Sequence, residues 1–159
     1  MGDNKESKEQ QHKDMMELHE RITELQKLEI EREKIENQLR KINEKIDKMF
    51  SQAKEGLVII QNRLVKYASP YAAELTGRTV DEIINTSFAQ YIHHDELPRL
   101  AKYYLQRIAG EDVPNIYETI IKHKDGSDVY IAIKASVIQY QGRSADFAIV
   151  RKIPKPNNK

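Results

Sequence analysis

The chain has 159 residues, which is room for one domain of about 100 to 150 residues and an appendage. Its 26 lysines and arginines balance 25 aspartates and glutamates, so the net charge of +1 argues against attraction to nucleic acid or an anionic membrane. There is no cysteine, which excludes disulfides, thiolate metal ligands, cysteine nucleophiles and cofactors tethered through sulfur.

The N-terminal segment MGDNKESKEQQHKD is polar where a signal peptide would be apolar, and we expect residues 1–15 to be disordered. No apolar run along the chain approaches the roughly 20 residues that cross a bilayer. We therefore expect a cytoplasmic protein without a membrane segment.

Residues 16–54 are highly charged and free of proline and glycine, which predicts one long helix. Apolar side chains recur along it in two heptad registers, and so narrow a stripe favours a coiled coil over a helix that covers a domain. One register holds Leu28, Ile35, Ile42 and Met49, and the other holds Leu25, Leu39, Ile46 and Ala53. Arg32 is the one misfit, and the spacing of the upstream apolar residues predicts a phase slip near Leu25–Leu28.

The long helix therefore predicts a homodimer through residues 16–54, with the parallel and antiparallel arrangements both open. The alternative is a single amphipathic helix that packs on its own domain.

After Gly56 the apolar period changes to two, which marks the start of a globular domain at about residue 55. Two strands are predicted at 57–60 and 64–68, joined by a tight turn in which Asn62 takes a positive φ. A short helix at 70–76 follows, with Ser69 as its N-cap and Gly77 as its left-handed stop.

A second short helix is predicted from about residue 80 to 85, with Thr79 as its cap. Apolar residues on one face predict a longer amphipathic helix at 95–109, followed by Gly110. Three strands at 115–123, 128–140 and 144–153 then follow, joined by turns at Asp125-Gly126 and Gln141-Gly142. In the middle strand one face is expected to be buried, namely Val129, Ile131, Ile133, Ala135 and Val137. The fold class is α+β, in the order ββαααβββ.

Residues 55–153 resemble a PAS domain, a sensor fold with a five-stranded antiparallel sheet and flanking helices. The resemblance rests on EGLVIIQNRLVKYASPYAAELTGRTVDEI, on the acidic HHDE that opens the long helix, and on HKDGSDVYI at the third hairpin. The family usually has asparagine where this chain has Ser69, and its last strand usually leads into Asp-Ile-Thr. Here that strand runs into Pro154, and residues 154–159 are expected to form a C-terminal tail.

The YIHHDELP stretch offers His93 and His94 as metal-ligand candidates, but adjacent side chains on a helix or strand point in different directions. Asp95 and Glu96 instead suit the start of a helix, where carboxylates accept free amide hydrogens. We therefore predict a helix start and no metal site.

No phosphate loop, catalytic triad or carboxylate pair is present in the sequence, so we predict that the chain is not an enzyme. His19-Glu20 resembles the phosphoacceptor box of sensor kinases in two-component systems. No ATP-binding motif and no proline of that box accompany it, and surface His-Glu pairs are common on charged helices, which argues against phosphotransfer.

The PAS resemblance implies a pocket between the sheet and the long helix, and the candidate lining residues are Tyr104, Thr119, Ile121, Ile131 and Ile133. Flavin-binding relatives place side-chain amides where this chain has Ile121 and Ile131, which argues against flavin. Haem-binding relatives use an axial histidine on the long helix, and residues 95–109 contain none. The cofactor is thus unknown, and the core is either filled or holds a small apolar ligand with Tyr104 and Thr119 as polar handles.

The resemblance implies a sensor or signal-transduction module that dimerises through its N-terminal coiled coil and responds to a small ligand or a protein partner. The alternatives are a ligand-free dimerisation or docking scaffold, and a fragment of a larger sensor kinase or transcription regulator.

Overall fold

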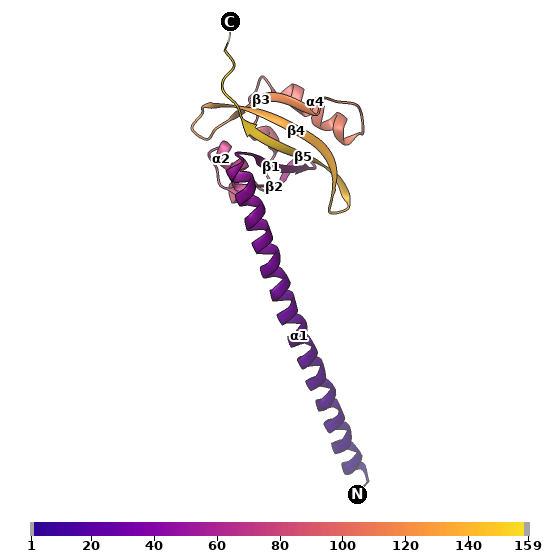
Figure 1. Cartoon of the computed structure of the whole chain (residues 1–159). Helices are drawn as coiled ribbons and strands as arrows, with labels where there is room; N and C mark the ends of the chain where they lie inside the picture. The colour runs from indigo at the N-terminus through magenta and orange to yellow at the C-terminus, as the bar shows by residue number, and fades with distance from the viewer. Residues whose placement is uncertain (1, 158–159) are drawn as a thin grey trace. The chain divides into compact units, whose positions relative to one another are not determined.

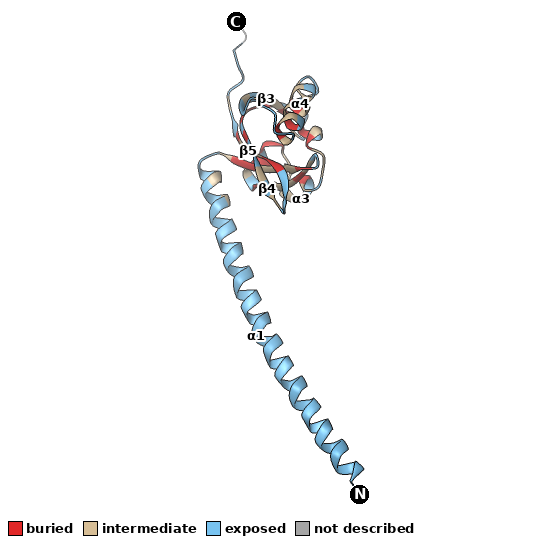
Figure 2. Ribbon diagram, turned by 90° about the vertical axis from the view of Figure 1, so that its right-hand side faces the viewer, coloured by how far each residue is buried: buried red, intermediate tan, exposed pale blue. Residues whose placement is uncertain are grey.

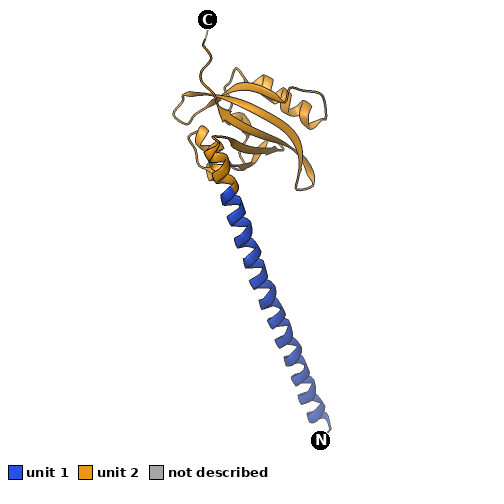
Figure 3. Ribbon diagram, viewed as in Figure 1, with its two compact units in different colours: residues 1–45 blue, residues 46–159 orange. Residues whose placement is uncertain are grey.

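The computed structural model describes residues 2–157. The chain consists of two compact units, residues 1–45 and residues 46–159 (Figure 3). Helix α1 (Asp3–Gln52) accounts for all of the helical structure in the first unit and continues into the second. No residue of α1 is buried. None of the helices within residues 2–157 is both long enough and apolar enough to cross a membrane.

Helix α1 begins at Asp3, whereas residues 1–15 were expected to be disordered; Met1 lies outside the described residues. The segment 3–15 contains no proline or glycine and is rich in lysine, glutamate and glutamine, which have high helix propensity. Once a helix is nucleated further along the chain, adding such residues at its end costs little free energy.

The second unit is built on one five-stranded antiparallel sheet, as the family resemblance implied, and its strand order is β2-β1-β5-β4-β3 (Figure 1). Its strands are β1 (Gly56–Gln61), β2 (Leu64–Ala68), β3 (Ile116–Lys122), β4 (Asp128–Tyr140) and β5 (Arg143–Lys152). Strand β1 pairs with both β2 and β5, so the first and last strands of the domain are neighbours. After β5, residues 153–157 form no helix or strand, and Asn158 and Lys159 lie outside the described residues.

Four short helices lie between β2 and β3: α2 (Pro70–Leu75), α3 (Val80–Ile83), the 3-10 helix η1 (Phe88–Tyr91) and α4 (Leu97–Ile108). The predicted caps are confirmed, because Ser69 Oγ accepts from the Ala72 amide and Thr79 forms a capping box with Glu82. Helix η1 was not predicted, since four residues are too few to show a helical period. Buried residues gather between these helices and one face of the sheet (Figure 2).

The turns follow the predicted residues closely. Asn62 and Arg63 both have a positive φ between β1 and β2, which is typical of a two-residue hairpin. Gly77 ends the turn after α2 at φ +72°, where a Cβ would lie 2.4 Å from the His123 ring. The positive φ favours glycine there, and the His123 ring would have to move to admit a larger residue.

The inner face of β4 is buried at Val129, Ile131, Ile133 and Ala135, as predicted. Val137 has the same strand parity but is 43% exposed, so its predicted burial is wrong. Alternation along a strand identifies a face, but it does not show where the covering helices stop.

Candidate functional site

A cavity of about 110 Å³ lies between the sheet and the four short helices. All five strands and all four helices contribute side chains to its lining, and most of these are aliphatic or aromatic. An apolar cavity of roughly 150 Å³ is large enough to bind benzene in an engineered protein. This cavity is smaller, so benzene marks about the upper limit of the molecules for which it has room.

Four of the five predicted pocket residues line the cavity: Tyr104, Ile121, Ile131 and Ile133. The three isoleucines come from the inner faces of β3 and β4 and are at most 7% exposed. Their contribution is apolar surface without hydrogen-bonding groups. Alternation along the strand predicted the face that holds Ile131 and Ile133, whereas Ile121 and the pocket itself were assigned from the family resemblance.

Thr119 is buried but is not among the lining residues. Its hydroxyl donates to the carboxylate of Glu96 at 2.9 Å, so it already has a partner outside the cavity. Nothing in the sequence pairs these residues, which lie 23 positions apart.

Tyr104 lies on the buried face of α4, and its ring centroid is 5.3 Å from that of Phe88 in η1. The hydroxyl oxygen accepts a hydrogen bond from the Arg63 amide at 3.0 Å. This bond fixes the phenol against the hairpin between β1 and β2. The hydroxyl retains a proton that it can donate.

A buried ion pair that the sequence analysis missed lies at the edge of the cavity. Arg107 Nη1 of α4 donates to Asp146 Oδ2 of β5 at 2.9 Å, and Nη2 donates to the Pro114 carbonyl at 2.8 Å. The two charged side chains are only 6% and 7% exposed. The available signal was Asp146 itself, because it shares its strand parity with the apolar Ala148 and Val150.

Burial raises the pKa of the Asp146 carboxyl, and the nearby positive charge of Arg107 opposes this rise. Its second oxygen, Oδ1, is fully buried and has no hydrogen-bond partner within residues 2–157. Burial also raises the pKa of Tyr117, which lines the cavity and lies 5.8 Å below the Arg107 guanidinium. This end of the cavity is the polar end.

Glu96 precedes α4 but its carboxylate does not cap the helix, so that prediction is wrong. Its backbone is already helical (φ −90°, ψ −20°), whereas a capping side chain requires an extended backbone. The carboxylate instead binds Arg99 and Thr119. Burial pushes the pKa of Glu96 upward, but these two hydrogen bonds and the charge of Arg99 outweigh it and lower the pKa.

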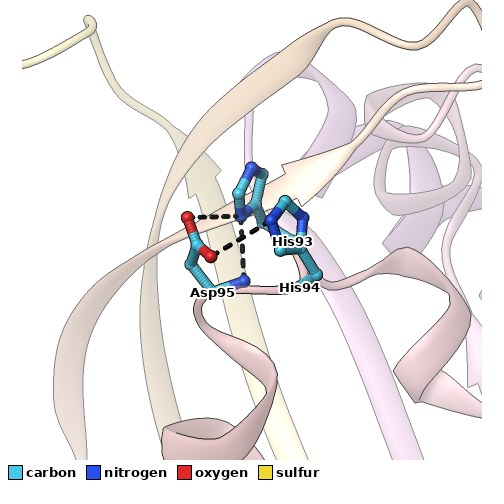
Figure 4. Close-up of side chains that lie close together, drawn as sticks. All are labelled: His93, His94 and Asp95. Atoms are coloured by element: carbon cyan, nitrogen blue, oxygen red, sulfur yellow. Dashed lines mark hydrogen bonds and ion pairs between the residues drawn. The ribbon is translucent and has the colours of Figure 1, made fainter.

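His93, His94 and Asp95 lie together in the turn before α4 (Figure 4). The two rings stack at 4.3 Å, so the prediction that they point in different directions is wrong; that rule applies to helices and strands and these residues are in a turn. The Asp95 amide donates to His93 Nδ1 at 3.1 Å, which uses that nitrogen's lone pair. The His94 and Asp95 side chains are 80% and 74% exposed, and the hydrogen bond from the Asp95 amide to His93 orders the entry to α4.

Tyr67 joins the sheet to the last turns of α1. Its side chain lies opposite Ile59 in the β1–β2 pair, and its hydroxyl donates to Asp47 Oδ1 at 3.0 Å. Burial, this hydrogen bond and the charge of Asp47 raise the pKa of Tyr67 from 10.0 to about 12. The next pair along these strands, Ile60 and Val65, lines the cavity. The Tyr67 contact and the cavity therefore lie on the same two strands.

This contact gives a pH prediction. Because the folded pKa of Tyr67 is above the unfolded value, its hydrogen bond stabilises the fold fully below pH 10 and is lost between pH 10 and about 12. Tyr67→Phe should remove one late-titrating tyrosine from the ultraviolet absorbance titration. The stability difference between the two proteins should also narrow above pH 10. Loss of the tyrosine absorbance step near pH 10, and not near pH 12, in Tyr67→Phe would show that Tyr67 ionises as an ordinary tyrosine.

Comparison with known proteins shows the same fold. A family model described as the PAS fold matches residues 44–151. The PAS domain of an HTR-like protein from Haloarcula marismortui has 13% identity and a TM-score of 0.56, over 76% of this chain and 99% of that one. Among curated proteins, no sequence matches this chain.

Two similar structures come from Burkholderia thailandensis. One is a sensory box histidine kinase/response regulator, with 17% identity and a TM-score of 0.51 over 65% of this chain and 80% of that one. The other is the PAS domain of a LuxR-family transcriptional regulator in complex with ethanol, with 18% identity and a TM-score of 0.50. It covers 64% of this chain and 90% of that one.

Proposed function

Because the chain belongs to the PAS-fold family, a sensory and regulatory fold, we propose that it is a signal-transduction module that binds a small apolar molecule in its core cavity. In this proposal the chain is not an enzyme, and it acts as a homodimer in which α1 carries the response. The observation that carries the proposal is the apolar cavity of about 110 Å³ inside the sensory fold.

The size of the cavity limits the ligand. Pockets for drug-sized molecules have volumes of roughly 300–1,000 Å³, and this cavity is much smaller. The proposed ligand is therefore far smaller than haem or flavin. The ethanol complex of the similar LuxR-family domain is an example of a PAS domain with a ligand of this class. Of the predicted residues, Tyr104, Ile121, Ile131 and Ile133 form our proposed site, and Thr119 does not.

The heptad stripe on α1 supports the proposed dimer. Between residues 25 and 49 of α1, the apolar residues of the stripe are 37–67% exposed: Leu25, Leu28, Ile35, Leu39, Ile42, Ile46 and Met49. The stripe from Leu25 to Met49 lies on a helix in which no residue is buried. A second copy of α1 would bury this stripe in the geometry of a coiled coil.

The proposed route of the signal runs from the cavity through β1 and β2 to α1. Ile60 and Val65 line the cavity, and Tyr67 on the same hairpin bonds to Asp47 of α1. A ligand that moves these strands would change the end of α1 through this hydrogen bond. Occupancy of the cavity then biases the helix pair, as a ligand biases any two-state element that it binds unequally.

Xenon is a suitable probe because it occupies apolar cavities without needing a hydrogen bond. In the full chain, xenon should shift the methyl resonances of Ile121, Ile131 and Ile133. The amide resonances of residues 46–52 should also shift, since the signal is proposed to reach α1. The absence of any xenon shift at these methyls would contradict the proposal, and shifts confined to the cavity would leave a ligand-binding domain without a response.

A variant in which a larger side chain fills the cavity tests whether xenon binds there. Ala148 lines the cavity, and Ala148→Ile should abolish the xenon shifts while raising the free energy of unfolding by about 0.5–2 kcal/mol, because the added groups fill empty space. Ala132→Ile is the control, since Ala132 lies on β4 with the opposite strand parity to Ile131 and Ile133 and does not line the cavity. Equal xenon shifts in Ala148→Ile and wild type would place the bound xenon outside this cavity.

A further inference from the structure

The polar end of the cavity contains a carboxylate with one oxygen engaged and one free. Arg107 holds Oδ2 of Asp146 and also donates to the Pro114 carbonyl. Asp146 is 5% exposed, it lines the cavity, and its Oδ1 has no partner within residues 2–157. Buried carboxylate oxygens are normally satisfied by donors, because an unpaired acceptor loses its hydration without compensation.

Three of the four other polar side chains that line the cavity are hydrogen-bonded within the protein, and the fourth, Tyr117, has its ring 5.8 Å from the Arg107 guanidinium. Thr76 donates its hydroxyl proton to the Ala73 carbonyl, and the Tyr104 hydroxyl accepts from the Arg63 amide. The Tyr91 hydroxyl lies within hydrogen-bond distance of the Thr86 hydroxyl. Asp146 Oδ1 is thus a charged acceptor without a hydrogen-bond partner within residues 2–157, on a side chain that lines the cavity.

We propose that the cavity selects an uncharged molecule with a compact apolar body and one hydroxyl or N–H group, which donates a hydrogen bond to Asp146 Oδ1. This inference rests on the proposed function, since it names the ligand class of the same site. Hydrogen bonds to ionised acceptors are stronger than neutral ones, so this single contact gives orientation and selectivity.

The ligand is uncharged because the charge at this end is already balanced. Arg107 carries the positive charge that compensates Asp146. A ligand ammonium group would add a second buried cation without a counter-ion, and a ligand carboxylate would face the Asp146 carboxylate. A neutral donor satisfies Oδ1 without adding charge.

Three cyclic probes of similar size and shape test this inference on the full-length protein. Cyclopentanol has a donor, cyclopentanone has a carbonyl without a donor, and cyclopentylammonium has a donor and a charge. Dissociation constants come from isoleucine methyl shifts in titrations at neutral pH. Cyclopentanol should bind about tenfold or more tightly than cyclopentanone, because a hydrogen bond to a charged group is at stake. It should also bind more tightly than cyclopentylammonium.

A double variant, Arg107→Met with Asp146→Val, removes the acceptor and its counter-charge together. It should bind cyclopentanol and cyclopentanone equally. A second measurement needs no variant: the Asp146 carboxyl carbon resonance of the wild-type protein should shift with cyclopentanol and not with cyclopentanone. This resonance tests the proposed hydrogen bond even if the double variant does not fold.

The outcomes separate this inference from the function on which it rests. Equal binding of alcohol and ketone by the wild-type protein overturns the inference and leaves a cavity that binds apolar molecules. Tightest binding of the ammonium probe overturns it as well, as does an alcohol preference that persists in the double variant. If xenon binds and none of the three probes does, only this inference is overturned. If neither xenon nor any probe binds, the inference and the proposed function are both overturned.

Discussion

Arg107→Met is expected to lower the free energy of unfolding by about 3–5 kcal/mol, the usual cost of removing one partner from a buried ion pair. Methionine approximates the length of the arginine stem, so the loss comes mainly from the charge. Asp146 would be left buried beside an apolar cavity with neither oxygen bonded to Arg107. Denaturant unfolding followed by circular dichroism measures the change.

Arg99→Met is the matched control on the same helix. The Arg99 side chain is 39% exposed and binds Glu96 near the surface, so its loss should cost no more than about 1 kcal/mol. If Arg107→Met lowers the free energy of unfolding no more than Arg99→Met does, the buried pair of Arg107 and Asp146 contributes little to stability. The double variant Arg107→Met with Asp146→Val should recover most of the loss, because no buried charge remains.

The loss of unfolding free energy caused by Arg107→Met should also depend on pH. Burial already raises the pKa of Asp146, and removal of Arg107 should raise it further. A carboxyl whose folded pKa is raised destabilises the fold as the pH rises through that value. The deficit should therefore be full at neutral pH and shrink as the pH falls toward the ordinary aspartate value of 3.8.

Ile35→Lys combined with Ile42→Lys is expected to convert the proposed dimer to a monomer. Two copies would lose four buried isoleucines at about 1.5 kcal/mol each, or about 6 kcal/mol in total, which corresponds to roughly 10⁴-fold weaker association. Both residues belong to one register of the stripe, and each is about half exposed in the single chain. Sedimentation equilibrium measures the association.

Ile30→Lys is the control, since Ile30 is a 67% exposed isoleucine of α1 outside both heptad registers. It should leave association unchanged. Circular dichroism must show that the double variant keeps a folded domain. A wild-type chain that remains monomeric at micromolar concentrations would refute the dimer, and equal weakening by Ile30→Lys would show that association does not use the heptad stripe.

Local sequence signals predicted the elements whose causes are local. Ser69, Thr79, Asn62 and Gly77 each act on residues within four positions, and each takes the predicted cap or positive φ. The strands followed from alternating apolar residues, and their arrangement in one five-stranded antiparallel sheet followed from the family resemblance. Alternation also identified the buried face of β4, whereas the pocket was inferred from the resemblance.

Contacts between residues far apart in the sequence were not predictable in the same way. Arg107 and Asp146 are 39 positions apart. Strand parity with Ala148 and Val150 indicates that Asp146 is buried, but no local signal identifies Arg107 as its partner. Thr119 was assigned to the pocket as a polar handle, but its hydroxyl binds Glu96, which comes from the loop before α4. Helix η1 and the exposure of Val137 depend on how far the helical layer extends, which only the tertiary fold determines.

The most direct test of the account is a spin-label distance measured between the two copies with the cavity empty and filled. The chain has no cysteine, so Lys41→Cys gives one label on the exposed surface of α1 in each copy. Saturation of the cavity with cyclopentanol should shift the distance distribution, and the Ala148→Ile background should abolish the shift. An unchanged distribution in a protein whose cavity resonances are saturated would contradict the account and leave α1 as a passive dimerising helix.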